Sequence, residues 1–165
     1  MLSLETQSDD QRKRSHLFSA WLPVLLGIAL IALSSTDMFG ANHTSGPLRW
    51  LYQSLFGPVS TARWNQIHTH IRKTGHFLGY GTLGLLWLRA WWMALPRSRF
   101  LTDALLALLG TALVASSDEL HQAFLPDRTG RVQDVLLDCC GAIILQILVY
   151  VFMRVFKPKR LKRAK

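Results

Sequence analysis

Four long apolar blocks dominate this sequence and limit what it can fold into. They cover about residues 17–35, 75–95, 101–124 and 134–156. Each block has roughly 20 residues, which at a helical rise of about 1.5 Å per residue matches a hydrocarbon layer about 30 Å thick. Because backbone groups in lipid must bond within their own segment, each block is expected to be an α-helix. We therefore predict an all-α polytopic membrane protein, one domain over residues 1–165 built as a bundle of four transmembrane helices.

The basic residues predict the orientation of this bundle. The chain has 19 Lys and Arg against 10 Asp and Glu, a net charge of +9, and half of its residues are hydrophobic. Such numbers fit either a nucleic-acid binder or a membrane protein. The basic residues gather at the ends of the apolar blocks, which favours the membrane and argues against nucleic acid. Thirteen lie on one set of flanks and six on the other, so the positive-inside rule predicts both termini in the cytoplasm, with the basic tail 157–165 against the inner leaflet.

The first block also has to be compared with a cleaved signal peptide. Its apolar core is longer than the 7–15 residues or so that are usual for such a peptide, so we expect it to stay as a span. Its removal would leave the orientation of the other three blocks unchanged.

The outer loop, residues 36–72, contains two helical patterns of its own. In the stretch PLRWLYQSLFG, apolar side chains fall on one helical face: Trp50, Leu51, Leu55 and Phe56. This spacing, with aromatic residues suited to the headgroup level, predicts an interfacial amphipathic helix between the first two spans. Pro58 ends it, and Ser60 or Thr61 can cap a second helix that is expected to continue into the block 75–95.

The second block begins with polar residues at helical spacing. Lys73, His76 and Tyr80 are separated by three and four positions, so an ammonium, an imidazole and a phenol share one face. Small residues are interleaved with them and predict a close approach of another helix: Gly75, Gly79, Gly81 and Gly84.

The third block ends, and the fourth begins, with acidic residues. Asp118, Glu119 and Gln122 lie within about one turn, and Asp134 and Asp138 are four apart on one face. All of these polar groups fall at the same, outer end of the predicted bundle. The inner half of every block is expected to be apolar apart from Arg89. Ionisable groups at membrane depth are costly unless paired or hydrated, and they indicate functional sites.

These residues also form an ordered motif, K-x-x-H-x-x-x-Y, then S-x-D-E-x-x-Q-x-F-x-P-x-R, then D-x-x-x-[ND]-x-x-G. It resembles the VanZ family, which takes its name from a teicoplanin-resistance protein. The matching residues run from 73 to 141: Lys73, His76, Tyr80, Ser116, Asp118, Glu119, Gln122, Phe124, Pro126, Arg128, Asp134, Asp138 and Gly141. Asp138 stands where asparagine is usual in the family, and Leu145 replaces a common glycine. The resemblance implies a small protein of the bacterial cytoplasmic membrane that acts near the outer leaflet, where cell-wall precursors are displayed.

Three functions remain open on the sequence alone. The first is a site that binds or modulates an anionic envelope lipid, a lipid-linked cell-wall precursor or a lipoglycopeptide, as in teicoplanin resistance. Its ligand-binding residues would be drawn from all three polar segments: Lys73, Tyr80, Gln122, Arg128, Asp134 and Asp138. Arg128 suits a bidentate contact with phosphate or carboxylate.

The second is a membrane-embedded hydrolase or transferase acting on a lipid-linked phosphate. His76 or Glu119 would serve as general base with Asp118 as partner. A divalent metal held by these residues and Asp134 is chemically possible, but no metal-ligand spacing specifies one, so no metal ligand is assigned and the cofactor stays open. The third is a polar network that only packs helices, with a partner protein supplying the function. The sequence leaves the oligomeric state open.

Overall fold

The computed structural model describes residues 2–95, 97–125 and 130–156. Within these ranges the chain forms five α-helices, one short 3-10 helix and no strand: α1 (Leu2–Ser34), η1 (Asp37–Phe39), α2 (Ala41–Phe56), α3 (Thr61–Ala94), α4 (Phe100–Ala123) and α5 (Val132–Val155). The all-α prediction is confirmed.

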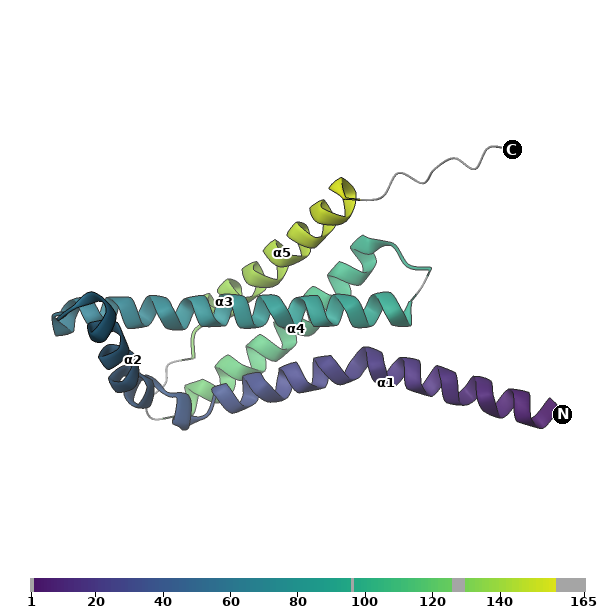
Figure 1. Ribbon diagram of the computed structural model, residues 1–165, viewed down its shortest axis with the longest axis horizontal. Coiled ribbons are helices and arrows are strands. Elements are labelled where there is room, and N and C mark those ends of the chain that lie inside the picture. Colours follow the sequence, from purple (N-terminus) through teal and green to yellow (C-terminus); the bar gives the residue numbers. More distant parts are fainter. Residues whose placement is uncertain (1, 96, 126–129, 157–165) are drawn as a thin grey trace.

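The longest of these helices, α3, lies at the centre of the bundle. It packs against α1, α4 and α5, and α4 and α5 also contact each other. Figure 1 shows α1 running alongside α3 while α4 and α5 cross it obliquely, and α2 lies at the end where α1 and α4 finish. On the side of α1, Val24 packs with Leu83 in the buried core. Nearby, the Trp21 ring meets two tryptophans of α3 edge-on, at centroid distances of 5.6 and 4.9 Å: Trp87 and Trp91.

Three of the described helices contain segments long and apolar enough to cross a membrane: Leu17–Ser34, Phe100–Ala123 and Val132–Val155. Their outward faces are apolar, as α4 shows with leucines at four-residue spacing that are each more than half exposed: Leu101, Leu105, Leu109 and Leu113. Apolar surface of this extent needs a lipid environment, so the chain is a membrane protein. The expected span 75–95 is not among the three, because its glycines, tryptophans and Arg89 lower its mean hydropathy. A bundle of four spans therefore stays a prediction.

The helix expected to continue into the second block does so without a break. α3 runs from Thr61 to Ala94, and the hydroxyl of Ser60 caps it by accepting a hydrogen bond from the Arg63 backbone N–H at 3.4 Å. The preceding helix differs from its expected start. α2 begins at Ala41 rather than near Pro47, which lies inside the helix. Proline's fixed φ is compatible with a helix, so the cost is mainly one lost backbone hydrogen bond and the crowding of the preceding turn.

α2 docks on the first turns of α3 through two side-chain contacts. The indole N–H of Trp64 donates to the hydroxyl of Ser45 at 2.7 Å, and the Thr44 hydroxyl lies 3.1 Å from Nε2 of His68. His68 is buried and stacks on Trp64. Burial, with a smaller contribution from the nearby Arg72 guanidinium, lowers the pKa of His68 below its usual value.

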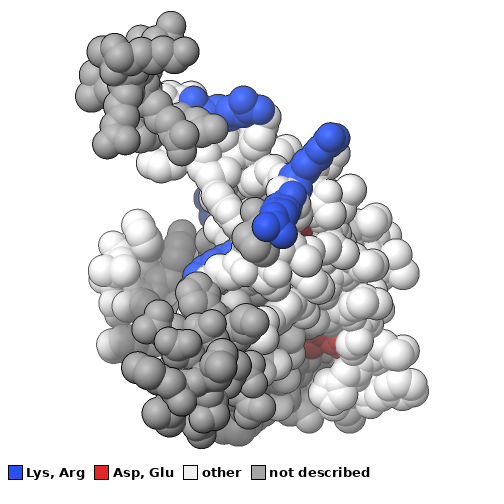
Figure 2. Space-filling model, turned by 90° about the vertical axis from the view of Figure 1, so that its right-hand side faces the viewer, with Lys and Arg blue, Asp and Glu red and all other residues white. Residues whose placement is uncertain are grey.

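The opposite end of the bundle carries basic side chains. It is formed by the end of α3, the start of α4 and the end of α5. Figure 2 views this end, where Lys and Arg stand out against a largely uncharged surface with little acidic area. The described basic residues of these segments are Arg89, Arg97, Arg99 and Arg154.

Candidate functional site

The polar ends of α3, α4 and α5 meet at one end of the bundle, as expected from the sequence. The side chains that the sequence places on one face of α3 contact different partners. Lys73 reaches Asp134 of α5, His76 reaches Asp138 of α5, and Tyr80 reaches Asp118 of α4. Arg128, also predicted in the site, lies outside the described residues. The functional roles assigned to all of these residues stay predictions.

A buried hydrogen-bond network ties α1, α3 and α4 together. The Tyr80 hydroxyl donates to Oδ2 of Asp118 at 2.9 Å, and the Gln122 amide donates to the same oxygen at 2.9 Å. The Gln122 amide also lies 3.3 Å from the Ser35 hydroxyl at the end of α1. All four side chains are buried. Because buried polar groups stabilise a fold only when paired, this network fixes the relative positions of three helix ends.

A second group brings together His76, Glu119 and Asp138, one residue from each of α3, α4 and α5. Nδ1 of His76 lies 3.5 Å from Oδ1 of Asp138, a long ion-pair distance that does not make a hydrogen bond. One potential ligand atom from each of the three side chains lies within 4.8 Å of the others. Asp138 is completely buried and Glu119 nearly so.

The segment that re-enters the bundle is held by Glu119. Its Oε2 accepts a hydrogen bond from the Arg131 backbone N–H at 2.8 Å, just before α5 begins. Lys73 and Asp134 form a third, more open contact, with Nζ and Oδ1 3.7 Å apart and the lysine side chain 54% exposed. This pair lies at the surface of the site and leaves the Lys73 ammonium accessible.

Close packing of α3 on α5 sets the positions of His76 and Asp138. A Cβ atom at Gly84 would lie 2.7 Å from the Cβ of Ala142, and one at Gly141 would overlap the carbonyl oxygen of Phe77. Gly81 is similarly crowded, so the prediction of a close helix approach is confirmed for Gly81 and Gly84. It is wrong for Gly75 and Gly79, which face open space.

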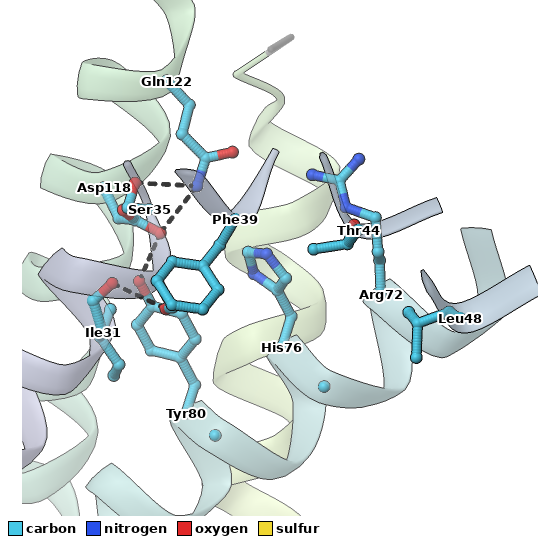
Figure 3. A pocket seen from close by; sticks show the side chains of 13 residues that line it. Ile31, Ser35, Phe39, Thr44, Leu48, Arg72, His76, Tyr80, Asp118 and Gln122 are labelled. Atoms are coloured by element: carbon cyan, nitrogen blue, oxygen red, sulfur yellow. Dashed lines mark hydrogen bonds between the residues drawn. The ribbon is translucent and has the colours of Figure 1, made fainter. Parts of the chain in front are cut away.

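Gly75 and Gly79 instead line a pocket of about 300 Å³ between α1, η1, α2 and α3. Apolar walls come from Ile31, Phe39 and Leu48, whereas polar groups come from α3 and α4: Arg72, His76, Tyr80, Asp118 and Gln122. In Figure 3, Ile31 and Asp118 lie on one side, Arg72 and Leu48 on the other, and Phe39 and His76 between them.

Two polar residues of this site, and one at the other end of the bundle, were not singled out in the sequence. Ser35 ends the first apolar block, where it reads as a surface residue. Arg72 adjoins Lys73 and falls four positions before His76, a spacing that would have placed it on the site's face. Asp103 lies buried near the other end of the bundle, where its Oδ1 accepts a hydrogen bond from the Ser98 hydroxyl at 2.6 Å. The expectation that Arg89 is the one polar exception in the inner half is therefore wrong.

The fold and this polar helix-end site define a small helical membrane protein with a cluster of ionisable groups at one end. The VanZ/LLP1 family model matches residues 7–154, and the chain belongs to this family. The match extends the resemblance of residues 73–141 to the first span and the outer loop. No curated protein and no solved structure gives a significant match.

Proposed function

We propose that this protein binds an anionic lipid of the cell envelope, or a lipid-bearing glycopeptide such as teicoplanin, in the pocket between α1, α2 and α3. The observation that carries this proposal is the lining of the pocket. A guanidinium and an imidazole, from Arg72 and His76, face a space with apolar walls and a floor of glycine. A headgroup with phosphate or carboxylate would meet the cation while an attached chain lies along the apolar walls.

The charges available in the pocket favour an anion. Asp118 is the acidic residue in the lining, and its Oδ2 already accepts hydrogen bonds from Tyr80 and Gln122. Arg72 makes no ion pair with another described residue, so its planar fork is available for a bidentate contact.

The proposed membrane placement has α3 as a fourth span over about 75–95. Since α1, α4 and α5 surround this part of α3, it needs less apolar surface than a helix that faces lipid. The apolar face of α2 points away from the protein, with exposed side chains suited to the interface: Trp50, Leu51, Leu55 and Phe56. The positive-inside rule then directs the pocket outward.

Binding is tested with the full chain in nanodiscs. Farnesyl phosphate is the probe for a polyprenyl phosphate, and farnesol is the uncharged comparison. Wild type should prefer the phosphate, and Arg72→Ala should weaken its binding about tenfold or more, as expected for a lost hydrogen bond to a charged group. Arg63→Ala on the same helix, outside the pocket, is the matched control. Equal binding of phosphate and alcohol, or equal loss in both variants, would contradict the proposal.

Filling the pocket gives a second test that leaves all charges in place. Gly79→Leu introduces a side chain into the open space and should abolish binding, whereas Gly46→Leu in α2 also meets open space but lies outside the pocket. In a susceptible bacterial host, wild type should reduce susceptibility to teicoplanin and Gly79→Leu should not. A resistance phenotype retained by Gly79→Leu at equal protein level would exclude this pocket.

Orientation is tested by labelling in intact cells. In a Cys139→Ser, Cys140→Ser background, Gln66→Cys lies beside the pocket end and Leu95→Cys beside the basic end. A membrane-impermeant maleimide should label Gln66→Cys on intact cells and Leu95→Cys only after permeabilisation. The reverse pattern would place the pocket in the cytoplasm.

A specific observation also keeps a membrane-embedded enzyme as the second candidate. His76 lines the pocket and lies 3.5 Å from Asp138, so a base oriented by a carboxylate faces the proposed headgroup. Release of phosphate from farnesyl diphosphate by wild type, lost in His76→Gln even at saturating substrate, would support turnover. If neither binding nor turnover occurs, the remaining candidate is a packing network with a partner protein.

A further inference from the structure

Two buried carboxylates and an imidazole converge beneath the pocket, and they come from three different helices. His76 belongs to α3, Glu119 to α4 and Asp138 to α5. One ligand atom from each lies within 4.8 Å of the others. Convergence of acidic groups alone has many causes, so the hydrogen bonding of these atoms has to decide what the cluster does.

The hydrogen bonding of Asp138 points to a missing partner. Asp138 is 0% exposed, and neither of its carboxylate oxygens has a hydrogen-bond partner among the described residues. Nδ1 of His76, directed at this carboxylate, is also buried without a hydrogen bond. Burying a carboxylate without a partner costs several kcal/mol or more, so such groups normally pair or coordinate a cation.

The nearby cations that the structure describes do not supply this partner. Lys73 contacts Asp134 on the exposed side of α5, at 3.7 Å. Arg131 approaches Glu119 through its backbone N–H, which orients the carboxylate but brings no charge to it. A protonated His76 would neutralise one of the two acids and leave the other.

We propose that His76, Glu119 and Asp138 bind one divalent cation of the Zn²⁺ or Mn²⁺ class. One imidazole nitrogen and two carboxylate oxygens form a donor set that suits these ions, whereas Mg²⁺ and Ca²⁺ take oxygen ligands. Three protein ligands leave a further coordination position, on the side where His76 borders the pocket. Ligand atoms about 2.0–2.2 Å from a tetrahedral Zn²⁺ lie about 3.3–3.6 Å apart. The 3.5 Å between Nδ1 of His76 and Oδ1 of Asp138 already fits this geometry, and no pair in the cluster is more than 4.8 Å apart.

The surrounding contacts are those that a cation site requires. The hydrogen bond from Arg131 to Glu119 fixes one ligand from outside, as partners of metal ligands commonly do. The close contact of Gly141 with Phe77 holds α5 against α3 beside the other two ligands. The site does not depend on a lipid in the pocket, so it stands apart from the proposed function.

Metal binding is measured directly on the full chain in detergent, purified without a polyhistidine tag and stripped with a chelator. After dialysis against Zn²⁺ or Mn²⁺, wild type should retain about one ion per chain by elemental analysis and gain thermal stability. His76→Ala, Glu119→Gln and Asp138→Asn should each weaken binding at least about tenfold. Asp138→Asn changes a single atom type, so it tests the site even where the other variants fail to fold.

Asp103→Asn is the matched control, because it also replaces a buried carboxylate, but near the other end of the bundle and outside the cluster. It should bind metal as wild type does. Absence of stoichiometric binding to wild type would overturn the proposal. Binding that is unchanged in all three cluster variants would also overturn it, since the ion would then be held by other histidines.

Discussion

Gly141 on α5 lies against Phe77 on α3 so closely that a Cβ atom at position 141 would overlap the Phe77 carbonyl oxygen. Phe77 directly follows His76, and Asp138 lies three residues before Gly141 on the same helix. The closest approach of the two helices therefore adjoins the approach of His76 to Asp138. A methyl group at position 141 would push α5 away from α3 and so would also separate His76 from Asp138.

Gly141→Ala is accordingly expected to destabilise the bundle by about 1–3 kcal/mol, the usual cost of overpacking a close contact. The free energy of unfolding in mixed micelles measures this change. Gly79→Ala is the control, because its Cβ would meet open space. Its better helix propensity should stabilise the protein by about 0.5–1 kcal/mol. Equal effects of the two variants would contradict the close crossing.

Sequence spacing identified the polar face of α3 but not the helix that each glycine faces. Gly75 and Gly79 share the four-residue spacing typical of helix crossings, yet they border the pocket, while Gly81 and Gly84 form the crossing. Both pairs, four and three residues apart, are spacings that place glycines on one side of a helix, and which side meets α5 depends on the packing of the whole bundle. Ser35 was missed for a similar reason, since its partner Gln122 is distant in sequence.

Tyr80→Phe is expected to destabilise the protein by about 1–3 kcal/mol. The substitution removes the hydroxyl that donates to Asp118 and leaves a buried carboxylate with one donor fewer. Tyr150→Phe is the matched control, because its side chain is exposed and its hydroxyl accepts a hydrogen bond from Arg154 at the surface. That change should stay within about 0.5 kcal/mol. Comparable losses of stability in both variants would contradict the conclusion that the hydrogen bonds of Tyr80 fix the three helix ends.

Lys73→Ala separates a structural role from a binding role. The Lys73 side chain is about half exposed in its pair with Asp134, so loss of the pair should change the free energy of unfolding by less than about 1 kcal/mol. If Lys73 belongs to the ligand site, binding of farnesyl phosphate should nevertheless fall severalfold. A large loss of stability with unchanged binding would assign Lys73 to packing instead.

His68 predicts an acid-sensitive attachment of α2. Its pKa in the folded protein is below the value of 6.5 expected when unfolded, because burial disfavours the charged imidazole. Between the folded and the unfolded pKa of His68, the unfolded chain therefore binds more protons than the folded protein. The stability that the protein has above about pH 6.5 is lost as the pH falls towards the folded pKa. The free energy of unfolding of wild type should be lower at about pH 5.5 than at about pH 7.5, and this decrease should be smaller in His68→Gln. His70→Gln, exposed on the same helix, should behave as wild type; a pH response shared by all three proteins would exclude His68.

The crowded contact between α3 and α5 also decides which wall of the pocket can move. α3 is one unbroken helix from Thr61 to Ala94, and it carries both the glycine floor of the pocket and the glycines of the crossing. Gly84 already packs closely against Ala142, so packing opposes a movement of this wall towards α5. The wall formed by η1 and α2 rests on α3 through a few side-chain contacts near Trp64 and His68. If a ligand enters the pocket as proposed, this wall is the one that can yield, and its side chains Phe39 and Leu48 would then limit the width of the entering molecule.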